Sequence, residues 1–83
     1  MYLQITRKMT LSTFTPEGEL MGTIQIDRIT TGRNKTTVAI KEEGIYNPQS
    51  FIIDRLIGMN VIEGLITLYY ESGNYMEITS RRD

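Results

Sequence analysis

The sequence predicts a mostly β protein: a small antiparallel barrel or sandwich of five to six strands, formed by a single domain over residues 1–83. Three features favour this class. The 83 residues include 12 Ile, 2 Val and 11 Thr, and β-branched side chains suit a pleated sheet better than a helix. Alanine, the best helix former, occurs once. Short runs of alternating apolar and polar residues are separated by Gly, Pro, Asn and Ser, as in chains of short strands and turns.

The first third of the chain reads as strand, turn and strand. Residues 2–8 form a first strand, and residues 9–15 either continue it or form a second one. Residues 15–18, Thr-Pro-Glu-Gly, have the composition of a tight turn, because Pro presets the φ angle of its second position and Gly suits its last. Residues 20–29 alternate apolar and polar side chains, which indicates a half-buried strand, and Gly22 marks either a bulge in it or a close approach of another backbone segment.

A second hairpin follows directly. Residues 30–34 form its loop, and we expect Gly32 and Asn34 to supply positive φ angles there, because these residue types tolerate them best. Residues 35–42 form the return strand, with alternate apolar side chains facing inward. Together these segments account for the first half of the sheet.

The C-terminal part of the chain contains the clearest hairpin signal. Two strands, at residues 65–71 and 75–79, flank the turn residues Ser, Gly and Asn at 72–74. Tyr69 and Tyr70 are adjacent on a strand and therefore point to opposite faces of the sheet. At most one of them belongs to the core, and the other lies on the surface.

The segment near 48–57 supports two interpretations. Asn47 followed by Pro48 resembles a helix N-cap with Pro at the first helical position, and Gly58 would then cap the C-terminal end of one short helix. The competing interpretation is a strand through residues 50–55 with alternating apolar side chains. The sequence leaves both open.

The composition argues for binding rather than catalysis. The chain has no His, Cys or Trp, so it lacks the usual zinc ligands, thiol nucleophiles and imidazole bases. The acidic pairs Glu17/Glu19 and Glu42/Glu43 lie at turns or strand ends, where nothing would separate the two pKa values as acid–base catalysis requires. We therefore expect no catalytic residue, no metal site and no cofactor.

Chain length and hydropathy suggest an oligomeric state and a cellular compartment. A domain of this length buries a modest core, and a second copy would complete it, so we expect a homo-oligomer, with a dimer favoured. No apolar run is long enough to span a membrane, and the first residues do not resemble a signal peptide. These features predict a cytoplasmic protein without a membrane partner.

Basic residues at strand ends suggest a nucleic-acid partner. Arg7 follows the first predicted strand's apolar residues, and Arg33 and Lys35 lie in the hairpin loop. Such side chains can contact phosphates and base edges of unpaired RNA. With 9 Lys and Arg against 10 Asp and Glu, the net charge is −1, which argues against strong binding that ignores sequence.

Two segments resemble the carbon storage regulator family of small bacterial RNA-binding proteins. These are Met1–Lys8, with Thr-Arg-Lys at its end, and Asn47–Arg55, with Pro48 and the final Arg. The resemblance implies an intertwined homodimer that binds GGA-containing single-stranded RNA loops and controls translation. The family's RNA-binding surface then corresponds to residues in two strand ends of this chain: Ile5, Thr6, Arg7, Ile53 and Arg55.

One departure from the family pattern bears on this surface. Asp54 stands where the family has His, and its carboxylate would compete with phosphate for the Arg55 guanidinium. The leading interpretation is a non-enzymatic, homodimeric post-transcriptional regulator that binds single-stranded RNA. The alternative is a small protein-binding module, an inhibitor or assembly subunit such as phages carry, that acts through its sheet surface.

Overall fold

The chain is an all-strand protein in the computed structural model, which describes residues 1–52 and 54–80. The mostly β, antiparallel prediction is confirmed, with seven strands where the sequence indicated five to six. Among the described residues there is no helix, and hence none that could cross a membrane. The strands are β1 (Leu3–Phe14), β2 (Leu20–Thr31), β3 (Thr36–Glu42), β4 (Ile45–Ile52), β5 (Leu56–Ile62), β6 (Leu65–Tyr70) and β7 (Tyr75–Ser80).

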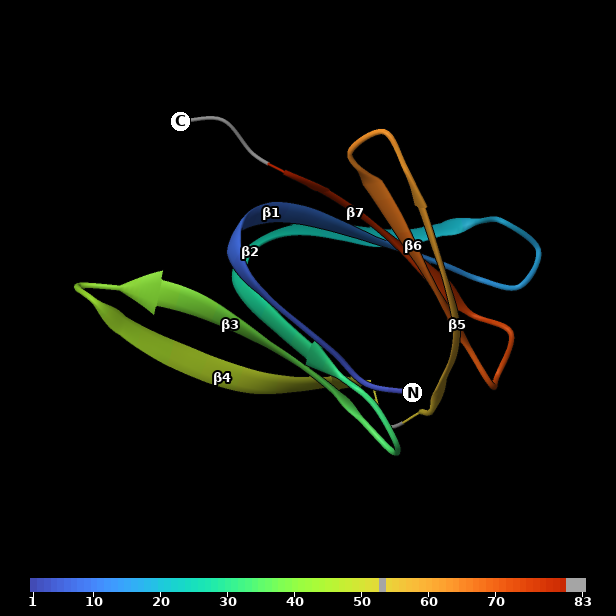
Figure 1. Ribbon diagram of the computed structural model, residues 1–83, viewed down its shortest axis with the longest axis horizontal. Coiled ribbons are helices and arrows are strands. Elements are labelled where there is room, and N and C mark those ends of the chain that lie inside the picture. The colour runs from blue at the N-terminus through green and yellow to red at the C-terminus, as the bar shows by residue number, and fades with distance from the viewer. Residues whose placement is uncertain (53, 81–83) are drawn as a thin grey trace.

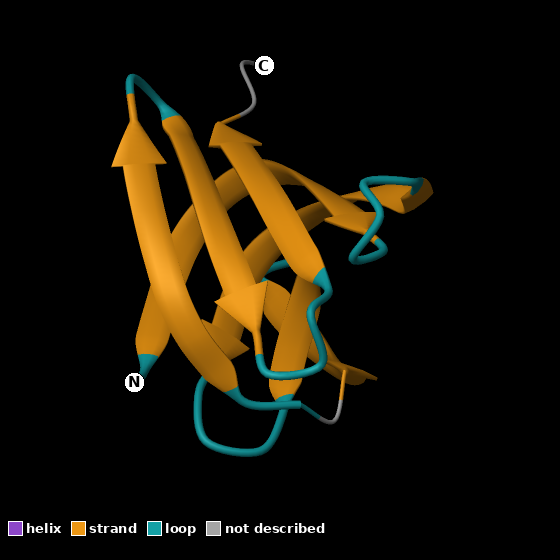
Figure 2. Ribbon diagram, turned by 90° about the vertical axis from the view of Figure 1, so that its right-hand side faces the viewer, coloured by secondary structure: helices purple, strands orange, loops and turns teal. Residues whose placement is uncertain are grey.

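All seven strands belong to one antiparallel sheet in the order β4-β3-β2-β1-β7-β6-β5. The long β1–β2 ribbon bends sharply in its middle, so the two halves of the sheet lie across one another (Figures 1 and 2). At the bend Arg7 and Lys8 of β1 face the single residue Asp27 of β2, which is a β-bulge. The first strand thus continues through residue 8 to Phe14.

The core lies between the two halves of the bent sheet. Ile26 and Ile29 are three residues apart on β2, yet both are fully buried. Regular alternation would place them on opposite faces of a flat sheet, so the bend is what lets both reach one core. The buried cluster consists of Met9, Leu11, Ile26, Ile29, Val38, Leu56, Leu68, Tyr70, Met76 and Ile78.

The helix interpretation of residues 48–57 is wrong. Residues 45–52 form β4, which pairs with β3 along its length, and β5 begins at Leu56. The strand interpretation of 50–55 holds as far as residue 52, while Ile53 lies outside the described residues. The pairing with β3 outweighs the local capping signal, and Pro48 fits because β4 is an edge strand.

Two short turns that the sequence analysis missed account for the additional strands. Glu43-Gly44 joins β3 to β4, and Glu63-Gly64 joins β5 to β6. All four residues have positive φ, at 51° and 79° in the first turn and 37° and 82° in the second, the conformation of two-residue hairpin turns. The positive φ angles expected at Gly32 and Asn34 are absent, because that loop spans four residues and needs no such turn.

The C-terminal hairpin agrees with the sequence prediction. Residues 71–74 connect β6 to β7, and Tyr69 pairs with Tyr75 across them. The Tyr75 ring also stacks on Phe14 of β1, with 5.0 Å between ring centroids. Tyr69 is 43% exposed and Tyr70 is 1% exposed, so the two do point to opposite faces.

The buried hydroxyl of Tyr70 joins β6 to the β2–β3 hairpin. Its oxygen lies 2.9 Å from the Oγ1 atoms of Thr31 and Thr36, which are 2.6 Å from each other. It also donates to the Met76 sulfur at 3.8 Å. Burial raises the pKa of the Tyr70 phenol, against the lowering effect of the hydrogen bonds with the two threonines. The three buried hydroxyls therefore hydrogen-bond one another across two elements of the sheet.

We expect Tyr70→Phe to destabilise the fold by about 1–2 kcal/mol, because the two threonine hydroxyls lose a buried partner. Tyr69→Phe is the matched control, since it removes an exposed hydroxyl from the adjacent position and should leave stability within about 0.5 kcal/mol. Urea unfolding followed by circular dichroism measures both. Equal stability of the two variants would show that the hydroxyl cluster contributes nothing.

We also expect stability to fall in alkaline solution. Because the pKa of Tyr70 is raised from 10.0 in the folded state, the unfolded chain releases this proton first. The contribution is fully present below about pH 10 and is lost as pH rises through the folded-state pKa. Thermal unfolding between about pH 8 and pH 11 should show this decline, and a shallower one in Tyr70→Phe. An identical decline in both proteins would contradict this assignment.

Candidate functional site

Three distant segments meet at one end of the molecule. The Leu56 amide donates to the Gly32 carbonyl at 3.1 Å, which holds the start of β5 against the β2–β3 loop. The N-terminus lies at the same place (Figure 1). A Cβ atom at Gly32 would come 3.1 Å from the Tyr2 ring, so a larger residue there would require this exposed ring to shift. The sequence separation of these segments hides their proximity.

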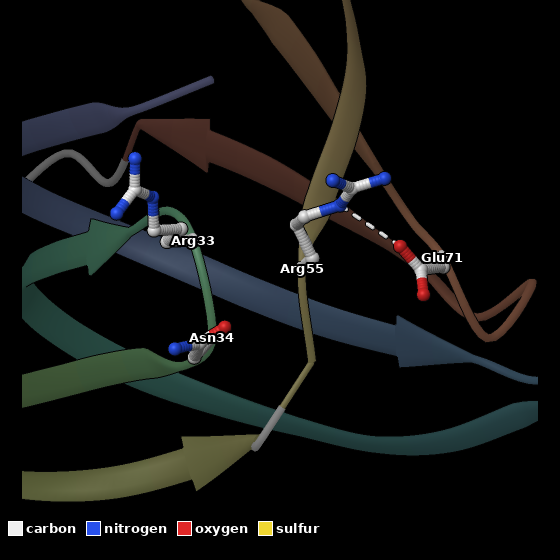
Figure 3. Close-up of a pocket in the computed structure, with 4 residues that line it drawn as sticks. All are labelled: Arg33, Asn34, Arg55 and Glu71. Carbon is white, nitrogen blue, oxygen red and sulfur yellow. Dashed lines mark ion pairs between the residues drawn. The ribbon is translucent and has the colours of Figure 1, made fainter.

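An open hollow of about 710 Å³ lies between these segments. It is lined by Arg33 and Asn34 of the β2–β3 loop, by Arg55 of the β4–β5 linker and by Glu71 of the β6–β7 turn. The two arginine side chains stand on either side of it, and Glu71 lies beyond Arg55 (Figure 3). A smaller hollow of about 310 Å³, lined by Met1, Arg55, Leu56 and Ile57, shares the Arg55 wall.

The position of Arg55 is fixed by its neighbour Asp54. One Asp54 carboxylate oxygen accepts from the Arg55 amide at 2.9 Å, and the other accepts from the amide and the hydroxyl of Ser72. The Glu71 amide donates to the Arg55 carbonyl at 2.9 Å. The linker is therefore attached to the β6–β7 turn by both main chain and side chain, and Arg55 projects from a braced segment.

The sequence analysis expected Asp54 to compete for the Arg55 guanidinium, and the competing carboxylate is instead Glu71. The Arg55 Nε lies 2.8 Å from the Glu71 Oε2, and both side chains are more than half exposed. Exposed ion pairs contribute less than about 1 kcal/mol. A ligand with a stronger negative charge can therefore draw the guanidinium away from Glu71.

The hollow brings together two of the predicted binding residues. Arg33 and Arg55 both line it, and Lys35 is exposed in the same loop as Arg33. Within the described part of the chain Arg33 makes no ion pair. Sequence reasoning missed Asn34 and Tyr2, whose ring is 67% exposed. The sequence did carry a signal for both: Asn34 lies between Arg33 and Lys35, and Tyr2 is the first residue of the first predicted strand.

The remaining predicted residues lie elsewhere. Ile5 is half-buried and packs against the core, while Thr6 and Arg7 are exposed at the bend of the β1–β2 ribbon. None of these three lines the hollow. Ile53 lies outside the described residues. The structure thus divides the predicted set into a group around Arg33 and Arg55 and a separate group at the bend.

Neither a cluster of metal ligands nor a similarity to known proteins indicates what the protein does. Among residues 1–52 and 54–80, no group of three or more acidic residues could hold a metal ion. The chain matches no protein-family model, no curated protein and no solved structure. The arrangement of side chains around the hollow is therefore what carries the functional argument.

We expect Asp54→Ala to destabilise the protein by about 1–2 kcal/mol, because a carboxylate that accepts three hydrogen bonds is lost. Glu71→Gln is the control: it removes a neighbouring exposed carboxylate that makes one surface ion pair, and its effect should stay below about 1 kcal/mol. Chemical denaturation gives both values. A larger loss in Glu71→Gln than in Asp54→Ala would reverse the roles assigned to the two carboxylates.

Proposed function

We propose that this protein binds single-stranded RNA at the Arg33–Arg55 hollow and acts, without catalysis, as a cytoplasmic post-transcriptional regulator. The observation that carries the proposal is the convergence of Arg33, Asn34 and Arg55 on one open hollow from segments about 20 residues apart in the sequence. The resemblance of residues 1–8 and 47–55 to the carbon storage regulators supports the same partner and a role in translation.

The side chains around the hollow suit an unpaired nucleotide. An arginine can make two hydrogen bonds to guanine or to a phosphate, and its flat guanidinium can stack on a base. The Asn34 amide offers both donors and acceptors for a base edge. The exposed Tyr2 ring, beside Gly32 at the edge of this site, offers a stacking surface. An open hollow admits a base that is turned out of a loop more readily than a paired one.

The charge distribution favours selective over indiscriminate binding. Arg33 and Arg55 line the hollow and Lys35 is exposed in the same loop as Arg33, against the carboxylates of Glu71 and Asp54. The local excess of positive charge is small, and the whole chain carries a net charge of −1. Few phosphates are then neutralised, so we expect affinity to depend on base contacts and to change only modestly with salt.

We expect Arg33→Ala and Arg55→Ala each to weaken RNA binding about 5- to 150-fold, the loss of about 1–3 kcal/mol that removal of a base-reading arginine produces. The probe is a fluorescent RNA hairpin with GGA in its loop, measured by anisotropy in low salt. Glu71→Gln should strengthen binding, because it frees the Arg55 guanidinium.

Lys41→Ala is the matched control for the arginine variants. It removes one positive charge from the β3–β4 hairpin, where Lys41 lies over the Tyr46 ring and away from the hollow. Its affinity should equal that of the unaltered protein. If Lys41→Ala weakens binding as much as Arg55→Ala, the protein responds only to total charge and the hollow is not the site. Equal affinity of all variants would also end the proposal.

A protein-binding module remains the second candidate. It is favoured by apolar side chains at the ends of two hairpins, where Leu20, Met21 and Ile45 are 57%, 59% and 65% exposed. Exposed apolar surface of this kind marks interaction sites. Because the chain lacks Trp, co-purified nucleic acid would dominate its ultraviolet spectrum. A clean tyrosine spectrum together with no binding of the RNA probe would favour this candidate.

A further inference from the structure

The two edges of the sheet are built differently. The β4 edge carries Pro48 at its middle, and a proline whose nitrogen faces solvent blocks the addition of another strand. The β5 edge, Leu56–Ile62, has no proline and no charged residue. Among the described residues nothing pairs with its outer side beyond the Leu56–Gly32 contact. Such an unprotected edge is a template for pairing.

The outward hydrogen-bonding groups of β5 follow from its turn. Ile62 and Leu65 flank the two-residue turn Glu63-Gly64 and form a hydrogen-bonded pair. Alternation along the ladder then directs the amide and carbonyl groups of Ile62 and Asn60 toward β6. The groups of Met59 and Val61 point outward, to the open side. They are two donors and two acceptors without a strand to receive them.

We propose that β5 pairs antiparallel with β5 of a second copy of this chain, about a twofold axis at Asn60. Met59 then lies opposite the partner's Val61, and Val61 opposite the partner's Met59. These are the residues whose backbone groups point outward, so each pair exchanges two hydrogen bonds. The axis places Asn60 opposite Asn60 of the partner as a non-hydrogen-bonded pair, in which side chains approach most closely.

The side chains of β5 are self-complementary about this axis. Met59 and Val61, which are 46% and 60% exposed, face each other and cover one another's apolar surface. On the opposite face Ile62, 59% exposed, lies over Gly58 of the partner, so a large residue meets a small one on each side of the axis. The two Asn60 amides can donate to and accept from each other.

The absence of charged residues from β5 favours a second copy as its partner. In a strand that pairs with itself, any charge near the axis meets its own copy, which is unfavourable. Residues 56–62 contain none. The proposal uses none of the residues that line the Arg33–Arg55 hollow, because the paired segment starts beyond Arg55. Pro48 at the other edge limits the assembly to two chains.

The first test is the mass in solution. Sedimentation should give twice the 9.6 kDa of one chain. Asn60→Asp places two like charges at the axis and should raise the dimer dissociation constant about tenfold or more at neutral pH. The matched control is Asn47→Asp, which makes the same change on the exposed β4 strand and should leave the dimer intact. Circular dichroism verifies that both variants are folded.

The second test is covalent and remains informative if Asn60→Asp fails to fold. The chain has no Cys, so Asn60→Cys introduces a single thiol at the axis, at a separation that a disulfide can bridge. Mild oxidation should convert it to a covalent dimer, whereas Asn47→Cys should stay largely monomeric. A monomeric unaltered protein would overturn the proposal. A dimer that is insensitive to Asn60→Asp and not cross-linked by Asn60→Cys would overturn it equally.

Discussion

The buried hydroxyl cluster of Tyr70, Thr31 and Thr36 determines how the sheet closes on itself. Burial of the apolar core brings the two halves of the bent sheet together, but it does not by itself decide where β6 meets the β2–β3 hairpin. The Tyr70 hydroxyl hydrogen-bonds the hydroxyls of Thr31 and Thr36 only when these elements meet, and without that contact it would be buried without them. Polar groups with so few possible partners favour one arrangement of the two halves, whereas apolar packing alone would tolerate several.

The candidate site is a consequence of that closure. Thr31 directly precedes Gly32, whose carbonyl accepts from Leu56, and Arg33 and Arg55 are the next residues on either side of this contact. The two arginines therefore flank a hydrogen bond between backbones, and both residues of that bond neighbour the buried cluster: Gly32 follows Thr31, and Leu56 pairs with Tyr70. The hollow is thus bounded by segments that hydrogen bonds join to one another, although the side chains that line it are exposed.

The sequence predicted those parts of the fold that depend on neighbouring residues. The abundance of Ile and Thr, the turn at residues 15–18 and the hairpin around residues 72–74 are local signals, and the structure follows them. Asn47-Pro48 is also a local signal, but its meaning depends on β3, which pairs with it. The strand β5 was missed because Glu63-Gly64 is an uncommon turn sequence and its first residue prefers other conformations.

The candidate site was predictable in its residue types and not in its geometry. Basic residues in a loop and at a strand end identified Arg33 and Arg55, but neither pattern nor spacing indicated that they share a hollow. The role of Asp54 depended on Ser72, 18 residues away, and the pairing of Arg55 depended on Glu71. Such contacts arise from the order of strands in the sheet, which a single sequence does not specify.

The two Glu-Gly turns make their hairpins less stable than the same hairpins could be with another residue in the turn. Glu43 and Glu63 hold left-handed backbone conformations that cost a residue with a Cβ atom about 1 kcal/mol or more. Asparagine adopts that conformation with less strain and is the usual residue at the first position of such turns. Each tip thus keeps an unrelieved local strain, and a one-residue exchange there offers thermostability without touching the core, either sheet edge or the hollow.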